Sequence, residues 1–271
     1  MIAIWQVKAT QIILKIKTGI LTFICACLLL CVCPAVFPQT QIVFAESPWP
    51  PYIIADTSTD EIRGGTMVEL VKTIFARLED TQVSFLHMPW ERLLYELELG
   101  NVDAVSLLEK NPHREVYLDY SDLIMTSDNV FFYATARHPK GITWHQLADL
   151  KKYHIGAIFG YVSTTKLGEA INNGVPIKLQ RIVATDEQMF RMLLQNRFDL
   201  VPFGEQVGKE LIKQHGWQGK IAAVSPPLYS ANYYMGFSKS GKHQNLIKRI
   251  NEVLAQMRQA GELEKILHPQ D

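Results

Sequence analysis

Cysteine is missing from most of this 271-residue chain. Its four cysteines, Cys25, Cys27, Cys31 and Cys33, all lie near the N-terminus. A folded part without cysteine forms no disulfide and must rely on its own hydrophobic core. The absence excludes a small disulfide-rich scaffold and a cysteine nucleophile.

An excess of charge and the common catalytic motifs are missing as well. The chain has 27 Lys and Arg against 27 Asp and Glu, and its basic residues are dispersed, so nothing indicates nucleic-acid binding. Its eight histidines show no i, i+4 pair with a third ligand, and neither a Gly-x-Ser-x-Gly elbow nor a Walker-type phosphate loop is present. We therefore expect no metal, no other cofactor and no catalytic residue of these kinds.

A segment of different composition opens the chain. Three lysines precede an apolar run from Gly19 to Val32, which ends at Pro34. A basic region, an apolar region and then small or turn-forming residues are typical of a secretory signal peptide. We predict a signal peptide over residues 1–35, cleaved after Ala35, and a periplasmic protein. The alternative is an uncleaved membrane anchor, because the apolar stretch approaches the ~20 residues that a span needs.

The rest of the chain alternates strand-like and helix-like stretches, which is typical of an α/β fold with parallel strands. We expect strands at Gln41–Ala45 and Gln82–Leu86. Apolar residues at helical spacing between Met67 and Leu78 predict the helix that joins them. A second helix, Trp90–Leu99, ends at Gly100, which suits a left-handed C-terminal cap.

A second copy of this helix–strand unit follows about a hundred residues later. Residues 100–105 and 196–201 share a residue that tolerates the left-handed conformation, two spacers, an aspartate and an apolar strand, so we expect a strand over Arg197–Val201. We expect Asp103 and Asp199 to brace turns rather than to touch a ligand. The repeat predicts two lobes.

Two apolar strands without helical period, Asn129–Thr135 and Asn232–Ser238, lie on either side of the second unit. They predict two crossovers between the lobes. The expected boundaries are 40–126 together with 234–271 for lobe 1, and 127–233 for lobe 2.

Residues that carry chemistry follow the predicted strand ends, where open α/β sheets bind ligands. In chain order they are Glu46, Trp49 and Tyr52, then Trp90 and Arg92, and then Glu109 and Arg114. In the second unit, the strand Ile155–Phe159 leads through Gly160 into a helix that begins near Ser163. Free amides and the positive dipole end of a helix favour an anion there.

The order of several short motifs resembles solute-binding protein family 3, the bacterial extracytoplasmic receptors for polar amino acids. The motifs are Trp-Pro-Pro-Tyr at 49–52, Pro-Trp at 89–90, Gly-x-x-Asp-Ala at 100–104, Asp-Tyr-Ser-Asp at 119–122, Gly-x-x-Ser at 160–163 and Gly-Phe-Ser-Lys at 236–239. The resemblance covers essentially the whole chain after the leader. It implies an α/β type II periplasmic binding protein fold, with two α/β lobes joined by two crossover strands. It also implies a monomer that presents a small, carboxylate-bearing solute to an ABC-type membrane permease complex.

Family likeness implies roles for matching positions. Arg114 matches the arginine that grips the ligand carboxylate, a task suited to a bidentate guanidinium. Trp49 and Trp90 match the aromatic residues that enclose the aliphatic part of the ligand, and Ser163 matches a second carboxylate contact. Each has a structural alternative, since the tryptophans could be core residues, Arg114 a surface ion-pair residue and Ser163 an N-cap.

One family position departs from the pattern. Where the family usually has an aspartate for the α-ammonium, this chain has Gly204, with Glu205 beside it. Either Glu205 or Glu109 takes over that contact, or the ligand is not an ordinary α-amino acid. Arg92 has the alternative of pairing with an acid on a solvated helix face.

Two other functions stay open from the sequence. A secreted dehydratase on the same scaffold would use a carboxylate in the cleft, Glu109 or Glu205, as general acid, which requires a raised glutamate pKa. A sensory binding module would bind solute and signal rather than feed transport.

Overall fold

The computed structural model describes residues 39–56, 59 and 61–268, and the predicted signal peptide lies outside them. In these ranges, no helix has the length and apolar character to cross a membrane. The described part contains a seven-stranded mixed sheet. Its strands lie in the order β10 (Val201–Gly204), β7 (Met125–Ala134), β11 (Ile221–Ser238), β5 (Ala104–Glu109), β1 (Thr40–Glu46) and β4 (Thr81–His87), and β6 (Leu118–Tyr120) pairs with β11. The predicted alternation of strands and helices is confirmed.

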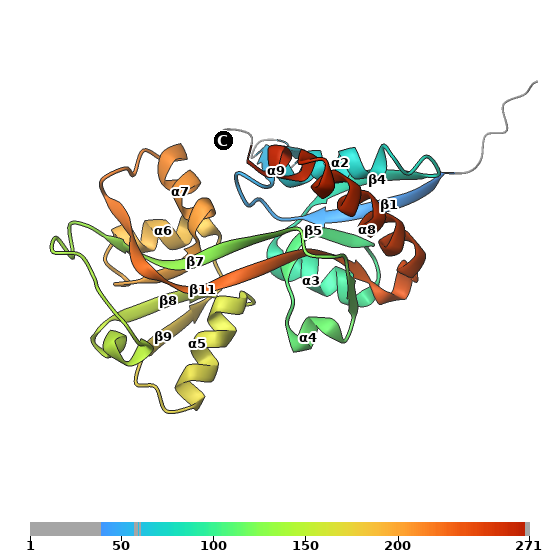
Figure 1. Ribbon diagram of the computed structural model, residues 1–271. Coiled ribbons are helices and arrows are strands. Elements are labelled where there is room, and N and C mark those ends of the chain that lie inside the picture. The colour runs from blue at the N-terminus through green and yellow to red at the C-terminus, as the bar shows by residue number, and fades with distance from the viewer. Residues whose placement is uncertain (1–38, 57–58, 60, 269–271) are drawn as a thin grey trace, which may run out of the picture. The chain divides into compact units, whose positions relative to one another are not determined.

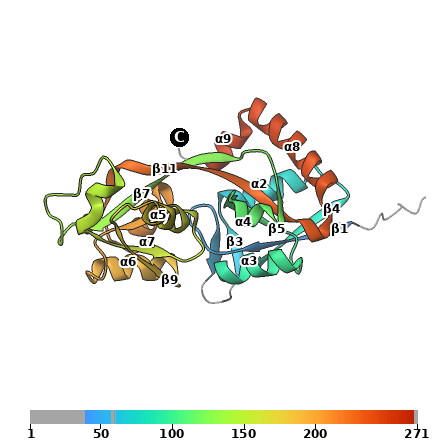
Figure 2. The same ribbon diagram turned by 90° about the horizontal axis from the view of Figure 1, so that it is seen from below.

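Lobe 1 is built on three parallel strands: β1 (Thr40–Glu46), β4 (Thr81–His87) and β5 (Ala104–Glu109). Helices α2 (Thr66–Phe75) and α3 (Trp90–Leu99) pack on them, and α8 (Gln244–Gln259) and α9 (Glu262–Leu267) pack against α2. Figures 1 and 2 show α2, α8 and α9 gathered together, with α3 apart from them. The buried face of α2 follows the apolar spacing that predicted the helix.

Lobe 2 repeats the same arrangement with different strands. Its elements are β8 (His154–Ile158), α5 (Val162–Asn172), β9 (Lys178–Ile182), α6 (Asp186–Leu194), β10 (Val201–Gly204) and α7 (Glu205–Gln214). Strands β8 and β9 are parallel, and Ile155 of β8 forms a parallel bridge with Leu200. The shorter elements of the described chain are β2 (Ile54–Asp56), β3 (Glu61–Gly64), α4 (Pro112–Glu115), β6 (Leu118–Tyr120), η1 (Leu147–Lys152) and η2 (Lys239–Gly241).

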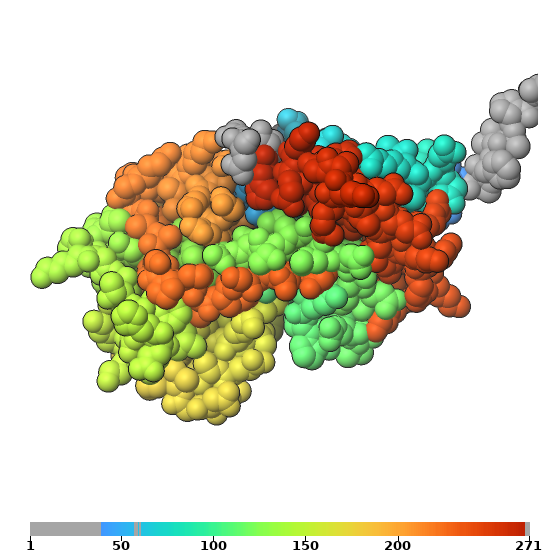
Figure 3. Space-filling view, viewed as in Figure 1, coloured from blue at the N-terminus to red at the C-terminus, as the bar shows by residue number. Residues whose placement is uncertain are grey.

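Two long antiparallel strands join the lobes. They are β7 (Met125–Ala134) and β11 (Ile221–Ser238), which pair along most of their length and appear side by side in Figures 1 and 3. The predicted lobe boundaries fall within these strands and stay a prediction. Strand β11 begins eleven residues before the predicted start at Asn232. Its register shifts between Val224 and Tyr229, around two prolines that cannot donate to a sheet, and this interruption hid the strand in the sequence.

The repeated unit is confirmed, with one correction at its second strand. Gly100 and Asn196 both adopt the left-handed conformation, with φ of 75° and 60°. The predicted strand Arg197–Val201 is wrong at its start, because β10 begins only at Val201. The preceding residues instead form a turn that is held by a buried carboxylate.

Two equivalent aspartates brace the two units. A carboxylate oxygen of Asp103 accepts a hydrogen bond from the Val43 N–H of the neighbouring strand at 2.8 Å. In the same way, Asp199 accepts one from the His154 N–H at 2.8 Å. This confirms the prediction that both aspartates brace the backbone.

Candidate functional site

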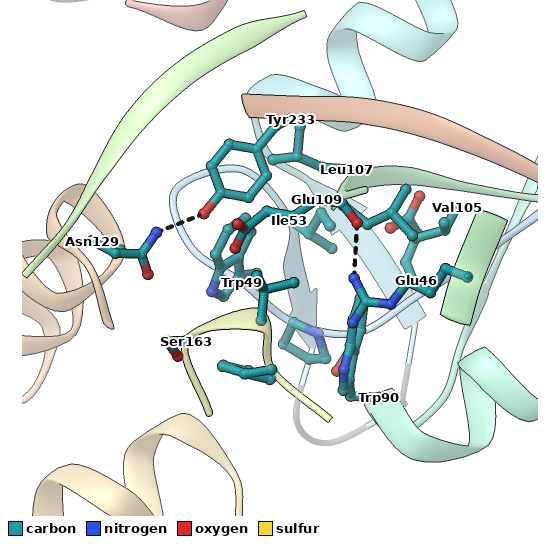
Figure 4. A pocket seen from close by; sticks show the side chains of 17 residues that line it. Glu46, Trp49, Ile53, Trp90, Val105, Leu107, Glu109, Asn129, Ser163 and Tyr233 are labelled. Carbon is teal, nitrogen blue, oxygen red and sulfur yellow. Dashed lines mark hydrogen bonds between the residues drawn. The ribbon is translucent and has the colours of Figure 1, made fainter. Parts of the chain in front are cut away.

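A cavity lies where the ends of β1 and β5 face the start of α5. It has a volume of about 60 Å³, which exceeds the ~10–15 Å³ that one water needs. Six of the predicted site residues line it: Glu46, Trp49, Trp90, Glu109, Arg114 and Ser163. Figure 4 shows side chains from both lobes around the cavity.

Arg114 is the central cation of the cavity. It lies in the short helix α4, whose N-cap, Asn111, accepts a hydrogen bond from the Arg114 N–H at 2.8 Å. The residue is 3% exposed, and its guanidinium donates to the carbonyl oxygens of Glu109 at 3.0 Å and Gly160 at 2.8 Å. Burial lowers the pKa of Arg114, and the nearby Tyr117, Tyr120 and two glutamates oppose that shift. Among the described residues the guanidinium forms no ion pair, so it retains the capacity to bind an anion.

Two tryptophans form apolar walls of the cavity. Trp90 is the first residue of α3, and the Arg114 guanidinium lies 5.2 Å from the centroid of its ring. Trp49 follows β1 and packs against Tyr52 and Tyr233, with ring centroids 5.5 and 5.4 Å away. Both indole N–H groups are buried without a hydrogen-bond partner in the described part of the chain. They are available to donate to a bound solute.

Glu46 is a fully buried carboxyl group at the end of β1. Its Oε1 accepts a hydrogen bond from the Ser106 N–H at 3.0 Å, whereas Oε2 has no partner among the described residues. Burial raises the pKa of Glu46 to about 8, although the contact with Ser106 opposes the shift. Because desolvation disfavours the charged form, the group holds a proton at neutral pH.

Glu109 ends β5 on the same cavity. Its Oε1 accepts a hydrogen bond from the Tyr229 hydroxyl at 3.0 Å. Burial raises the pKa of Glu109 to about 7, while Tyr229, Arg114 and Lys166 favour the ionised form. This carboxyl group can therefore accept or donate a hydrogen bond near neutral pH.

Lobe 2 contributes the start of α5 and the end of β10. Gly160 has φ of 82°, a conformation that L side chains rarely adopt, and it turns the chain into α5. Buried Ser163 lies in the first turn of α5, where backbone N–H groups lack partners within the helix. Gly204 lines the cavity without a side chain of its own.

Three predicted site residues do not line the cavity. Tyr52 is buried behind Trp49 and supports its ring. Arg92 is two residues after Trp90 on α3, which turns it to the other side of the helix. Its side chain is 69% exposed and lies 3.4 Å from Glu96. Glu205 begins α7 and pairs with Lys209 at 2.7 Å.

Sequence reasoning missed four polar residues of the cavity: Ser47, Asn129, Tyr161 and Tyr233. The Asn129 amide donates to the Tyr233 hydroxyl at 3.4 Å, as Figure 4 shows. Both belong to the crossover strands, whose inward-facing polar side chains were a signal in the sequence. Among the described residues, no group of three or more His, Cys, Asp and Glu side chains is arranged to hold a metal ion.

Comparisons with known proteins show the family of the chain and its fold. A model of the bacterial extracellular solute-binding proteins, family 3, matches residues 42–269. A probable histidine-binding protein of Neisseria gonorrhoeae is 24% identical over 204 residues, which cover 74% of this chain and 72% of that protein.

Two solved structures share the fold. A histidine kinase sensor domain with similarity to periplasmic binding proteins has a TM-score of 0.71 at 20% identity, with 85% of this chain and 95% of that one covered. An ancestral arginine-binding protein bound to arginine has a TM-score of 0.70 at 20% identity, with 86% and 97% covered. The predicted fold class, a type II periplasmic binding protein with two α/β lobes and two crossover strands, is confirmed.

Proposed function

Because the chain belongs to family 3 of the bacterial extracellular solute-binding proteins, we propose that it captures a small, carboxylate-bearing, amino-acid-like solute for an ABC-type permease. The proposal includes secretion to the periplasm by the predicted signal peptide and action as a monomer. No resident cofactor is required for this function, since binding depends on the side chains of the cavity.

The observation that carries the proposal is the buried guanidinium of Arg114. A buried charge without an ionic partner is costly, and a carboxylate that enters the cavity compensates it with charge-assisted hydrogen bonds. Trp90 supports the guanidinium from one side at 5.2 Å. We assign Arg114 to the solute carboxylate, with Ser163 as a second contact and Trp49 and Trp90 as apolar walls.

The other polar end of the solute needs acceptors. Gly204 supplies none, and Glu205 pairs with Lys209 outside the cavity. Glu46 and Glu109 line the cavity, and Glu46 Oε2 is a buried acceptor without a partner among the described residues. We infer that these two carboxyl groups receive N–H or O–H groups of the solute in place of the usual aspartate.

Binding would act on a contact that already joins the lobes. Arg114 of lobe 1 donates to the Gly160 carbonyl of lobe 2 at 2.8 Å. A solute that touches Arg114 and Ser163 together would favour the closed arrangement, because only that arrangement offers both contacts. The closed form would be the one that the permease recognises.

A thermal-shift screen of the mature chain against amino acids, amines and small carboxylates tests the proposal. We expect a positive shift with at least one carboxylate-bearing solute, and loss of that shift in Arg114→Ala. Arg92→Ala is the matched control, because it removes an exposed guanidinium outside the cavity. If calorimetry gave equal affinity for wild type and Arg114→Ala, the proposed site would be wrong.

Dehydratase activity on the same scaffold is a second candidate, favoured by one observation. Burial raises the pKa of Glu109 to about 7, which suits a general acid at neutral pH. Incubation with prephenate or arogenate tests it, with formation of an aromatic product as the positive result. Glu109→Gln is the control that should abolish that product. A sensory role without transport would instead appear as a signalling partner in a pull-down.

A further inference from the structure

Tyr161 joins the two lobes at the cavity wall. It is the N-cap of α5, and its ring lies edge-on to Trp90, with 6.1 Å between centroids and 85° between planes. Trp90 belongs to α3 of lobe 1 and carries the Arg114 guanidinium on its ring. The position of the Tyr161 ring therefore affects the packing of the Trp90 indole, which supports the Arg114 guanidinium.

A buried carboxylate holds the far end of Tyr161. The Tyr161 hydroxyl donates to Asp186 Oδ1 at 2.6 Å, a length typical of O–H bonds to ionised carboxylates. Asp186 Oδ2 is buried and has no partner in the described part of the chain. Burial raises the pKa of Asp186 to about 7, and the bond from Tyr161 opposes that shift. Burying this carboxylate costs free energy, so its place at the start of a helix does not by itself explain why it is buried.

Capping of α6 does not supply that explanation. Asp186 is the first residue of α6, but the N-cap Thr185 and Gln188 already form a reciprocal capping box, with hydrogen bonds of 3.2 and 3.0 Å. The next residue, Glu187, is a partly exposed acid in the same turn that pairs with Arg191 at 2.6 Å. The first turn thus has its cap and a second acid without the contact to Tyr161.

We propose that Asp186 is a positioning residue of the solute cavity, which holds the Tyr161 ring against Trp90 and thereby keeps the indole beneath the Arg114 guanidinium. Asp186 itself does not line the cavity, so it acts through Tyr161. The inference rests on the proposed function for its effect on solute affinity, but the ring contact itself is independent of any solute.

The first test follows the indole N–H resonance of Trp90 in two-dimensional NMR spectra of the purified protein without added solute. Trp90→Phe assigns the resonance. Asp186→Ala and Tyr161→Phe should each shift it, and the double variant should shift it no further, because both changes remove one interaction. Asp186→Asn keeps an acceptor oxygen and should restore most of the wild-type position.

Glu187→Gln is the matched control, since it removes a carboxylate from the same turn of α6 without touching Tyr161. It should leave the Trp90 resonance in place. If Asp186→Ala lowered thermal stability but left the Trp90 resonance unmoved, Asp186 would serve stability alone and the proposal would be overturned. Equal shifts of the Trp90, Trp144 and Trp217 resonances would overturn it as well, because they indicate a general change of fold.

The second test measures affinity for L-arginine and L-histidine by calorimetry. Where wild type binds, Asp186→Ala should bind about tenfold more weakly, as expected for loss of one hydrogen bond to a charged group. Unchanged affinity together with a moved indole would overturn the positioning role. If wild type binds neither amino acid, the proposed ligand class is in question, whereas the indole test still decides the role of Asp186 in the ring contact.

Discussion

Glu46→Gln should remove a pH-dependent penalty from the folded state. Burial raises the pKa of Glu46 from 4.5 to about 8, so the folded chain binds a proton that the unfolded chain has already released between these values. Stability conferred by the protonated group is complete below pH 4.5 and is lost as pH rises through 8. In that window the free energy of unfolding falls by about 1.4 kcal/mol per pH unit on account of this group.

The magnitude at pH 7 follows from the same values. The interval from 4.5 to 7 corresponds to a penalty of about 3 kcal/mol for wild type relative to low pH. The introduced glutamine side chain keeps the carbonyl acceptor for the Ser106 N–H but adds a buried amide that needs partners, which costs about 1–3 kcal/mol. The variant should therefore match or exceed wild-type stability at pH 7 and 8, and should fall below it at pH 5.

Denaturant unfolding at pH 5, 6, 7 and 8 measures this difference. The unfolding free energy of Glu46→Gln minus that of wild type should rise steadily with pH. The same difference should stay constant for Glu252→Gln, which changes an exposed glutamate of α8 whose charged neighbour, Arg249, does not titrate in this range. A constant difference for Glu46→Gln too would refute the reasoning. It would mean that water reaches the Glu46 carboxylate, so that burial does not raise its pKa.

Two further predictions concern glycines that are not required for backbone conformation. Gly204→Asp should fold normally, because a Cβ there lies 3.7 Å from Trp49, an ordinary contact. In calorimetry the variant should bind an α-amino acid at least tenfold (about 1.4 kcal/mol) more tightly than the same acid without its amine. Equal losses of affinity for the two ligands would contradict this prediction. Gly208→Ala should destabilise the fold by about 1–3 kcal/mol in denaturant unfolding, because its Cβ would lie 2.2 Å from the Phe132 ring. Unchanged stability would show that the ring moves aside.

Local signals predicted the elements that depend on neighbours in sequence. Helix α3 spans Trp90–Leu99 as predicted, because its apolar period and the cap at Gly100 are both local features. Strand β11 was underestimated, because its pairing with β7 continues past prolines that interrupt any local pattern. The lobe pair was predicted from a repeat whose two aspartates perform the same bracing role.

The candidate site likewise contains residues that local signals predicted and contacts that they did not. Arg114, Trp49 and Trp90 follow strand ends and match family motifs, so their place at the cavity was predictable. Arg92 and Trp90 are only two residues apart. The turn of helix α3 alone directs Trp90 to the cavity and the Arg92 side chain to solvent. The contact between Tyr161 and Asp186 spans 25 residues and two helices, and nothing in either local sequence indicates it.

By itself, the sequence determined the family, the two-lobed α/β architecture and the residue types available at the strand ends. Periodicity, caps and motif order carry that information, because they act over a few residues. Only the tertiary structure decided which charges are buried and which are paired. Glu46 lacks a partner for one oxygen among the described residues, Arg114 rests on Trp90 without an acid, and Glu205 turns away to Lys209. Desolvation and pairing depend on what the whole fold brings within a few ångströms, so no local pattern contains them.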